Sequence, residues 1–244
     1  MRVLRVSMLV TGTTVLFLTG QIVGIVLLIV ALQLFGYSAD SIQSALSDNS
    51  IIQFIAVATV GVLTVGLLYL VHRFAKKPFR TSIKLTGLPT SKHVSVTLLG
   101  YGLYFLCFVV VATLASLLIP ALDTEQMQQL GFESPAGYEL IFVFSALVIL
   151  PSITEEIVFR GFLFERLRNI VSLKLAVIIT SVLFGAAHLE FLSASSSLNW
   201  IAGIDTTVFS LFLIWVYVKT NSLWAPIMLH ALKNTVAFVV LFII

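Results

Sequence analysis

Long apolar runs without a charged side chain are the feature that most restricts how this chain can fold. The first run covers residues 6–39 and contains no Lys, Arg, Asp or Glu. A lipid-spanning helix needs about 20 apolar residues, and within a bilayer only helices and closed barrels pair all their backbone groups. Hydrophobic residues make up 59% of the chain and charged residues 10%, so we expect an all-α, polytopic transmembrane helical bundle. The pattern predicts about seven spans, at residues 6–39, 51–71, 94–121, 135–170, 173–191, 200–218 and 223–244.

The first run is longer than the apolar core of a cleaved signal peptide, so we expect it to be a retained transmembrane helix. Gly20 and Gly24 are four positions apart within it, a spacing that favours close packing of a second helix. Residues 40–50 are expected to form a polar loop. The single cysteine, Cys107, excludes an intrachain disulfide.

The charged residues predict the orientation of the chain in the plasma membrane. Basic residues lie before the first span and in the loop after the second, which places the amino terminus in the cytoplasm. The membrane topology accounts for the net charge of +3, so we expect no nucleic-acid partner. Contact with anionic lipid is an alternative role for the basic loop. The basic residues are Arg2, Arg5, Arg73, Lys76, Lys77, Arg80, Lys84 and Lys92; the alternate loops carry Asp40, Asp48, Asp123, Glu125, Glu133 and Glu190.

One short segment, TEEIVFR at residues 154–160, places two acids and an arginine inside an apolar run. Ionisable groups at membrane depth cost at least a few kcal/mol each, so they usually mark a functional site. On a helix Glu156 and Arg160 lie one turn apart and are expected to pair, whereas Glu155 points about 100° away and needs another partner. Pro151 is expected to kink the helix just before the glutamates.

Two further spans carry polar residues at helical spacing. Phe184 and His188 are four positions apart in the fifth run, and His230 and Asn234 are four apart in the seventh. Counted from the inner interface at about 1.5 Å per residue, Glu155, His188 and His230 lie ~20, ~22 and ~16 Å deep. We therefore expect these side chains to share one cavity that opens to the cytoplasm.

These residue types suit hydrolysis by an activated water. A carboxylate and a histidine that share a water act as a general-base pair, which here would be Glu155 and His188. A second histidine and an amide, His230 and Asn234, can donate hydrogen bonds to the oxyanion of a tetrahedral intermediate. The same imidazoles and carboxylate also suit zinc, although the His-Glu-x2-His motif of many zinc hydrolases is absent from the sequence.

The three segments resemble the motifs of the CPBP family of intramembrane proteases, also called the Abi family. The family includes the type II CAAX prenyl proteases and bacteriocin-immunity proteins, and the resemblance covers residues 138–242. It implies N-terminal transmembrane helices at residues 1–136 and a catalytic helical core at residues 137–244. The family pattern is Glu-Glu-x3-Arg, then Phe-x3-His, then His-x3-Asn, which this chain matches with Glu155, Glu156, Arg160, Phe184, His188, His230 and Asn234.

The resemblance implies a membrane-embedded endopeptidase whose active site faces the cytoplasm. Its partners would be the lipid bilayer and a peptide or protein substrate, prenylated CaaX peptides being one class. Glu155 and His188 would activate the water, and Glu156 and Arg160 would support the site. If Zn2+ is bound, its ligands would be Glu155, His188 and His230.

Two other functions remain open. A non-catalytic immunity or scaffold protein could use the same fold. A proton-coupled transporter built from inverted repeats is expected to have polar breaks in the spans of both halves. It is disfavoured here, because no charged residue falls inside a predicted span within residues 1–134. Asp205 and Lys233 are also within predicted spans, and we expect them to pair because unpaired charges at that depth are costly.

Overall fold

The computed structural model describes residues 1–119, 132, 135–189 and 199–244. Over these residues all regular structure is helical, which confirms the all-α prediction. The helices are α1 (Arg2–Leu34), α2 (Ala39–Asp48), α3 (Ser50–Phe74), α4 (Phe79–Ser82), α5 (Ser91–Leu118), α6 (Glu139–Phe144), η1 (Ser145–Ile149), α7 (Leu150–Glu156), η2 (Ile157–Phe164), α8 (Glu165–Leu167), α9 (Leu173–Ala186), α10 (Trp200–Thr220) and α11 (Trp224–Phe242), where η denotes a π-helix.

Six helices in the described part of the chain are long and apolar enough to cross a membrane. They are α1, α3, α5, α10, α11 and the continuous stretch Glu139–Leu167, which joins α6 to α8. The chain is therefore a multi-pass membrane protein. The remaining expected span, at residues 173–191, is the shorter helix α9, which ends at Ala186.

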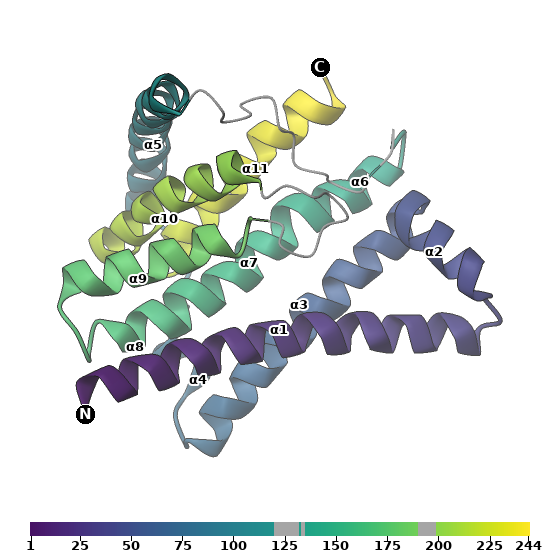
Figure 1. The fold of residues 1–244 in the computed structure, drawn as a ribbon, viewed down its shortest axis with the longest axis horizontal. Coiled ribbons are helices and arrows are strands. Elements are labelled where there is room, and N and C mark those ends of the chain that lie inside the picture. Colours follow the sequence, from purple (N-terminus) through teal and green to yellow (C-terminus); the bar gives the residue numbers. More distant parts are fainter. Residues whose placement is uncertain (120–131, 133–134, 190–198) are drawn as a thin grey trace.

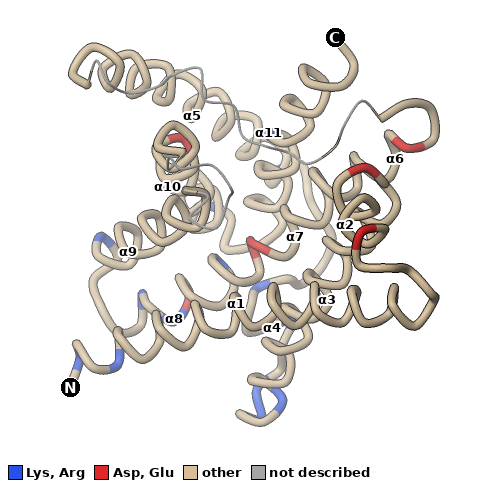
Figure 2. The backbone as a smooth tube through the Cα atoms, turned by 45° about the vertical axis from the view of Figure 1, so that its right-hand side comes forward, with Lys and Arg blue, Asp and Glu red and all other residues tan. Residues whose placement is uncertain are grey.

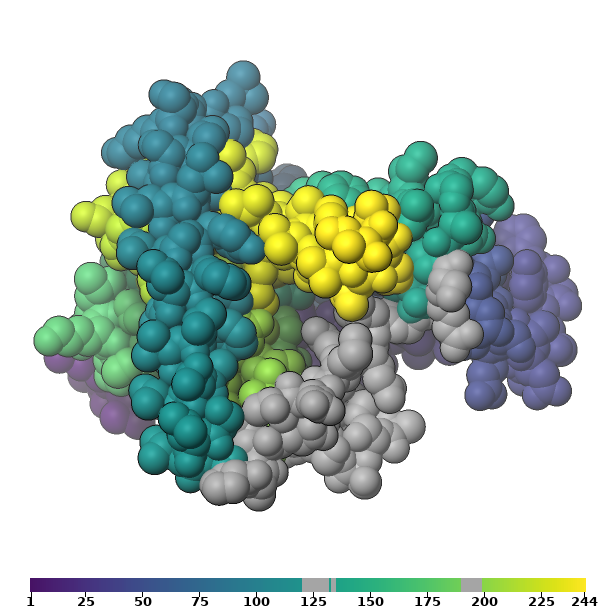
Figure 3. Space-filling view, turned by 90° about the horizontal axis from the view of Figure 1, so that it is seen from above, coloured from purple at the N-terminus to yellow at the C-terminus, as the bar shows by residue number. Residues whose placement is uncertain are grey.

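The stretch from α6 to α8 runs through the middle of the molecule (Figure 1). Helices α1 and α3 lie on one side of it, and α9, α10 and α11 lie on the other. Helix α5 is outermost and packs against α10 and α11. Viewed from above, the end of α11 lies between α5 and α6 (Figure 3). Helices from both halves of the sequence thus surround the segment that carries the two glutamates.

Helices α1 and α3 pack closely at the two glycines that the sequence singled out. A Cβ atom at Gly24 would lie 2.8 Å from Val60 Cγ2, and one at Gly20 would overlap the side chain of Thr64. Both glycines are buried. The predicted close-packing face is therefore confirmed, since any larger residue would push the two helices apart.

The expectation of a polar loop at residues 40–50 was wrong, because most of this segment forms α2. The Ser38 hydroxyl accepts a hydrogen bond from Ser41 N at 3.2 Å and caps the helix, and Asp40 lies in its first turn. Ile42 is buried in a small cluster with residues of α1 and α3, including Leu28 and Ile52. Ala45 and Leu46 pack against the same cluster, so this short apolar face and the cap account for a helix in a polar connection.

The basic loop between α3 and α5 is tied to the turn between α10 and α11. The Leu223 N–H donates to the Lys84 carbonyl at 3.0 Å, and Lys84 Nζ lies 3.2 Å from Glu165 Oε1. Ile83 is completely buried against Gly161, where a Cβ would lie 2.9 Å from the Ile83 Cβ. This loop therefore closes one end of the bundle through Ile83 and Lys84, while its other basic side chains are exposed.

The described charges separate toward opposite ends of the molecule. Apart from the acids of α7, α8 and α10, Asp and Glu mark α2 and the start of α6, whereas Lys and Arg gather near the N-terminus and α4 (Figure 2). This separation agrees with the expected cytoplasmic amino terminus. Asp123, Glu125, Glu133 and Glu190, which also supported that orientation, lie outside the described residues, so the orientation and the division at residue 136 stay predictions.

Candidate functional site

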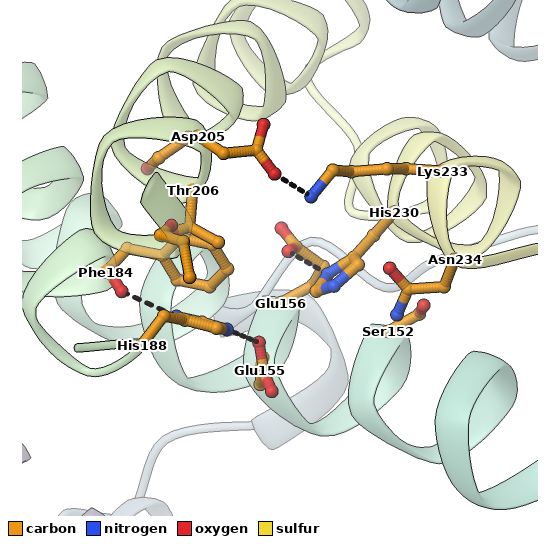
Figure 4. Close-up of polar contacts among 12 residues, drawn as sticks. Ser152, Glu155, Glu156, Phe184, His188, Asp205, Thr206, His230, Lys233 and Asn234 are labelled. Carbon is orange, nitrogen blue, oxygen red and sulfur yellow. Dashed lines mark hydrogen bonds and ion pairs between the residues drawn. The ribbon is translucent and has the colours of Figure 1, made fainter. Parts of the chain in front are cut away.

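A cavity of about 390 Å³ lies where α7, α10 and α11 meet the end of α9. Its lining includes Glu155, His188, His230 and Asn234 together with Lys233. Four predicted site residues from three separate segments therefore share one cavity, as the helical spacing indicated (Figure 4).

Glu155 and His188 face each other across a gap. His188 Nε2 lies 3.8 Å from Glu155 Oε2, and each side chain is 20% exposed. His188 Nδ1 donates to the Phe184 carbonyl at 2.8 Å, which leaves Nε2 as the nitrogen directed at the carboxylate. A separation of 3.8 Å is too long for a direct hydrogen bond and suits a bridging water. This pair can therefore hold one water between two acceptors.

Glu156 has a different environment although it is the next residue. Its side chain and that of Arg160 are 0% exposed, and Arg160 Nη1 donates to Glu156 Oε1 at 2.8 Å. Arg160 Nη2 also donates to the Ser210 hydroxyl at 2.7 Å. The expected Glu156–Arg160 pair is present, and it lies in the dry interior and not in the cavity.

The Glu156 carboxylate also fixes the orientation of His230. His230 Nδ1 lies 2.9 Å from Glu156 Oε1, so Nδ1 donates to the carboxylate. His230 Nε2 is then the ring nitrogen available to a molecule in the cavity, which His230 lines. An imidazole whose other ring nitrogen is hydrogen-bonded to a carboxylate has a fixed tautomer and a fixed ring orientation.

Phe184 is a packing residue between the two histidines. Its ring is completely buried, with centroids 4.7 Å from the His188 ring and 6.0 Å from the His230 ring. The Arg160 guanidinium lies 4.2 Å above the same ring, a cation–π contact. The ring therefore supports both imidazoles and the buried cation.

Asn234 has a partner that the sequence analysis did not anticipate. Its Nδ2 donates to the backbone carbonyl of Leu147 at 2.9 Å. Leu147 lies in η1, directly before Pro151, where we expected a kink and the structure has a π-helical segment. Nothing in the sequence pointed to this contact, because it depends on how α11 packs against the π-helical segment.

The expected pair of Asp205 and Lys233 is also present. Lys233 Nζ lies 2.7 Å from Asp205 Oδ2, and the Tyr104 hydroxyl donates to Asp205 Oδ1. Tyr104 comes from α5, so this cluster joins α5, α10 and α11. Nothing in the sequence pointed to Tyr104, because it lies 101 residues away from Asp205 in the chain.

The predicted zinc ligands do not form a metal-binding group. Among the residues that the structure describes, no three His, Cys, Asp or Glu side chains lie close enough together to hold one ion. Each ring turns Nε2 to the cavity, because His230 Nδ1 is engaged by Glu156 and His188 Nδ1 by a backbone carbonyl. Because Glu155, His188 and His230 are not grouped as ligands of one ion in the described structure, the chemistry below uses no metal.

The fold and the cavity define a class: a multi-pass helical membrane protein with paired acids and histidines beneath its surface. The comparison with protein families specifies it further. Residues 137–236 match the model of the family described as Type II CAAX prenyl endopeptidase Rce1-like. This part of the chain is therefore an Rce1-like domain, which confirms the resemblance seen in the motifs and implies a peptidase. No curated protein and no solved structure matches the chain.

Proposed function

We propose that this protein is an intramembrane endopeptidase that hydrolyses a peptide bond with a water held by Glu155 and His188. The observation that carries the proposal is the 3.8 Å gap between Glu155 Oε2 and His188 Nε2 in a cavity within the bundle. A water in this gap donates one hydrogen to each acceptor and keeps its lone pairs for attack on a carbonyl carbon.

Proton transfer follows from the two acceptors. As the water oxygen bonds to the carbonyl carbon, Glu155 takes a proton, and the pair later returns a proton to the leaving amine. Glu156 does not share this task, because its side chain is fully buried outside the cavity and its Oε1 already accepts from Arg160 and His230. Adjacent glutamates thus have separate roles, a base in the cavity and a buried support.

His230 and Asn234 are the proposed donors to the oxyanion. For this task His230 Nε2 needs a proton while Nδ1 also carries one, and the Glu156 carboxylate 2.9 Å from Nδ1 compensates the positive charge of that imidazolium. Asn234 has a second amide hydrogen besides the one given to Leu147. Arg160 Nη1 donates to the same Glu156 oxygen and holds the carboxylate in place for this purpose.

The proposed substrate is a peptide or protein that reaches the cavity from the cytoplasmic side of the plasma membrane. A prenylated CaaX peptide is the first substrate to test, because the matching family is described as CAAX prenyl endopeptidases. Lys233, which lines the same cavity, gives it a cation beside Glu155 and the two histidines.

The test is cleavage of a prenylated CaaX peptide by the protein in proteoliposomes. Glu155→Gln removes the base without changing shape, and we expect a loss of about 10²- to 10⁴-fold in kcat/KM. Glu139→Gln is the matched control, because Glu139 is an acid at the start of the same span, away from the cavity, and it should keep wild-type activity.

A zinc chelator separates the mechanisms. Activity that survives the chelator and disappears in Glu155→Gln supports the proposed water activation, whereas activity lost in both supports a metal. If Glu155→Gln is fully active, the assigned base is wrong. If the wild type cleaves no peptide, prenylated or not, the non-catalytic immunity or scaffold role becomes the better account.

A further inference from the structure

Lys233 is the cation that a molecule in the cavity can reach. Among the described residues that line the cavity, it is the only lysine or arginine, and its side chain is 22% exposed. Arg160 is the other cation near the two glutamates. It is 0% exposed, lies outside the cavity lining and donates to Glu156 and Ser210. An anionic group that enters the cavity would therefore meet Lys233.

The ammonium group of Lys233 has donors that its known contact does not use. A lysine ammonium carries three hydrogens and no acceptor. One hydrogen goes to Asp205 Oδ2, which lies 2.7 Å from Nζ. Within the part of the chain that the structure describes, the other two hydrogens have no hydrogen-bond partner. Nζ also lies 4.9 Å from the centre of the Phe209 ring, which lines the cavity, so the unused hydrogens are available to an acceptor there.

Asp205 and Tyr104 hold the ammonium from the side away from the cavity. The Tyr104 hydroxyl donates to Asp205 Oδ1, and Lys233 donates to Oδ2, so each carboxylate oxygen has a donor. Neither Asp205 nor Tyr104 is among the cavity-lining residues. Figure 4 shows Lys233 directed at Asp205 beside His230. The acid thus balances the charge of the lysine inside the bundle and fixes the position of its ammonium.

Lys233 is also close to the proposed donors to the oxyanion. It follows His230 by three residues and directly precedes Asn234 on α11. Three residues of α-helix rise about 4.5 Å, and an extended peptide advances about 3.3 Å per residue. A group bound by Lys233 therefore belongs to a residue only a few positions from the bond that is cleaved. Two groups of a peptide are acceptors with a negative charge: the C-terminal carboxylate and the side chain of an acidic residue.

We propose that Lys233 is a specificity residue that binds a carboxylate of the peptide substrate through the two hydrogens that Asp205 leaves unused. This inference rests on the proposed function, because it names the group that places the peptide in the same cavity. Lys233 acts on substrate binding, while His230 and Asn234 keep their role at the oxyanion. The protein should accordingly favour cleavage a few residues from a free carboxylate.

The test compares prenylated CaaX peptides that end in a carboxylate with the same peptides that end in a carboxamide, in proteoliposomes. A hydrogen bond between charged groups corresponds to about 10- to 100-fold in binding, so the wild type should favour the acid by this factor, mainly through KM. A second pair of amidated peptides, with Glu or Gln as the last residue, shows whether a side-chain carboxylate serves as well. Lack of an acid preference in both pairs would overturn the proposal.

Lys233→Met should abolish the acid preference and leave cleavage of the amidated peptide in place. Because this change leaves Asp205 without its cation, Asp205→Asn/Lys233→Met is the second variant, and it should lack the preference too. Lys219→Met is the matched control, since Lys219 is an exposed lysine of α10 outside the cavity lining, and it should keep the wild-type preference. A preference that survives in both Lys233 variants, or that disappears in the control, would contradict the proposal.

The kinetics also separate substrate binding from action on the reacting carbonyl. If Lys233→Met lowers kcat equally for the acid and the amide, the lysine stabilises the oxyanion and the inference is wrong. Fluorescence anisotropy of labelled peptides with Glu155→Gln protein in detergent measures binding without turnover. If the wild type cleaves nothing, the proposed function fails, but tighter binding of the acid that is lost in Glu155→Gln/Lys233→Met would still support the carboxylate site. Equal binding of acid and amide would overturn it.

Discussion

Replacing Arg160 with methionine removes the cation of a fully buried ion pair and leaves Glu156 in the dry interior. Both side chains are 0% exposed and their charged atoms are 2.8 Å apart. Breaking such a pair by removing one partner costs about 3–5 kcal/mol, because the remaining charge is neither solvated nor balanced. The Ser210 hydroxyl also loses the guanidinium, which lies 2.7 Å away.

The expected loss can be stated as a shift in melting temperature. A chain of this length loses about 2–4 °C per kcal/mol, so Arg160→Met should lower the unfolding midpoint by about 6–20 °C. Thermal unfolding in detergent, followed by the fluorescence of the three tryptophans, measures this shift. The Glu156→Gln/Arg160→Met variant should regain much of the loss, since it removes both charges together.

Arg168→Met is the matched control for the buried arginine. Its side chain is 30% exposed and lies 3.4 Å from Glu165 Oε2, in a surface pair worth about 0–1 kcal/mol. The control should therefore shift the midpoint by less than about 4 °C. If Arg160→Met shifts it no more than the control does, Glu156 and Arg160 are not a buried charged pair, and the division of roles between the two glutamates is refuted.

Two more perturbations test contacts elsewhere in the bundle. In a double-mutant cycle, Asp205→Asn and Lys233→Met should couple by about 0.5–3 kcal/mol, because the charged atoms of Asp205 and Lys233 are 2.7 Å apart. Additive losses in the free energy of unfolding would contradict this pair. Gly24→Ala should destabilise the protein by about 1–3 kcal/mol, because the added Cβ presses on Val60. The control Gly12→Ala should not, because nothing lies within 4 Å of its added Cβ. Equal melting temperatures of the two variants would contradict the close approach of α1 and α3.

The sequence predicted the parts of the site that depend on helical spacing. Glu156 and Arg160 are one turn apart, so their contact needs only a helix, and the depth estimate correctly brought Glu155 and His188 into one cavity. The Asp205–Lys233 pair followed from the cost of two charges in apolar spans. In each case the prediction rests on the spacing of residues along a helix or on the high cost of an unpaired charge in an apolar span.

Contacts that depend on the packing of distant segments were not predictable from one sequence. Tyr104 reaches Asp205 from α5, and no periodicity links residues so far apart in the chain. The contact of Asn234 with Leu147 depends on the approach of α11 to the π-helical segment η1, and neither is visible in the sequence. Helix α2 was missed because its apolar surface is small, with Ile42 buried and Ala45 and Leu46 partly buried beside it.

The last helix holds the site together through three contacts on different elements. His230 binds α7, Lys233 binds α10 and Asn234 binds η1, all within little more than one turn of α11. A rotation or slide of α11 as a rigid rod would break all three contacts together, and none could be kept alone. The polar centre is therefore expected to assemble in one concerted step, with seating of α11 as the event that completes it.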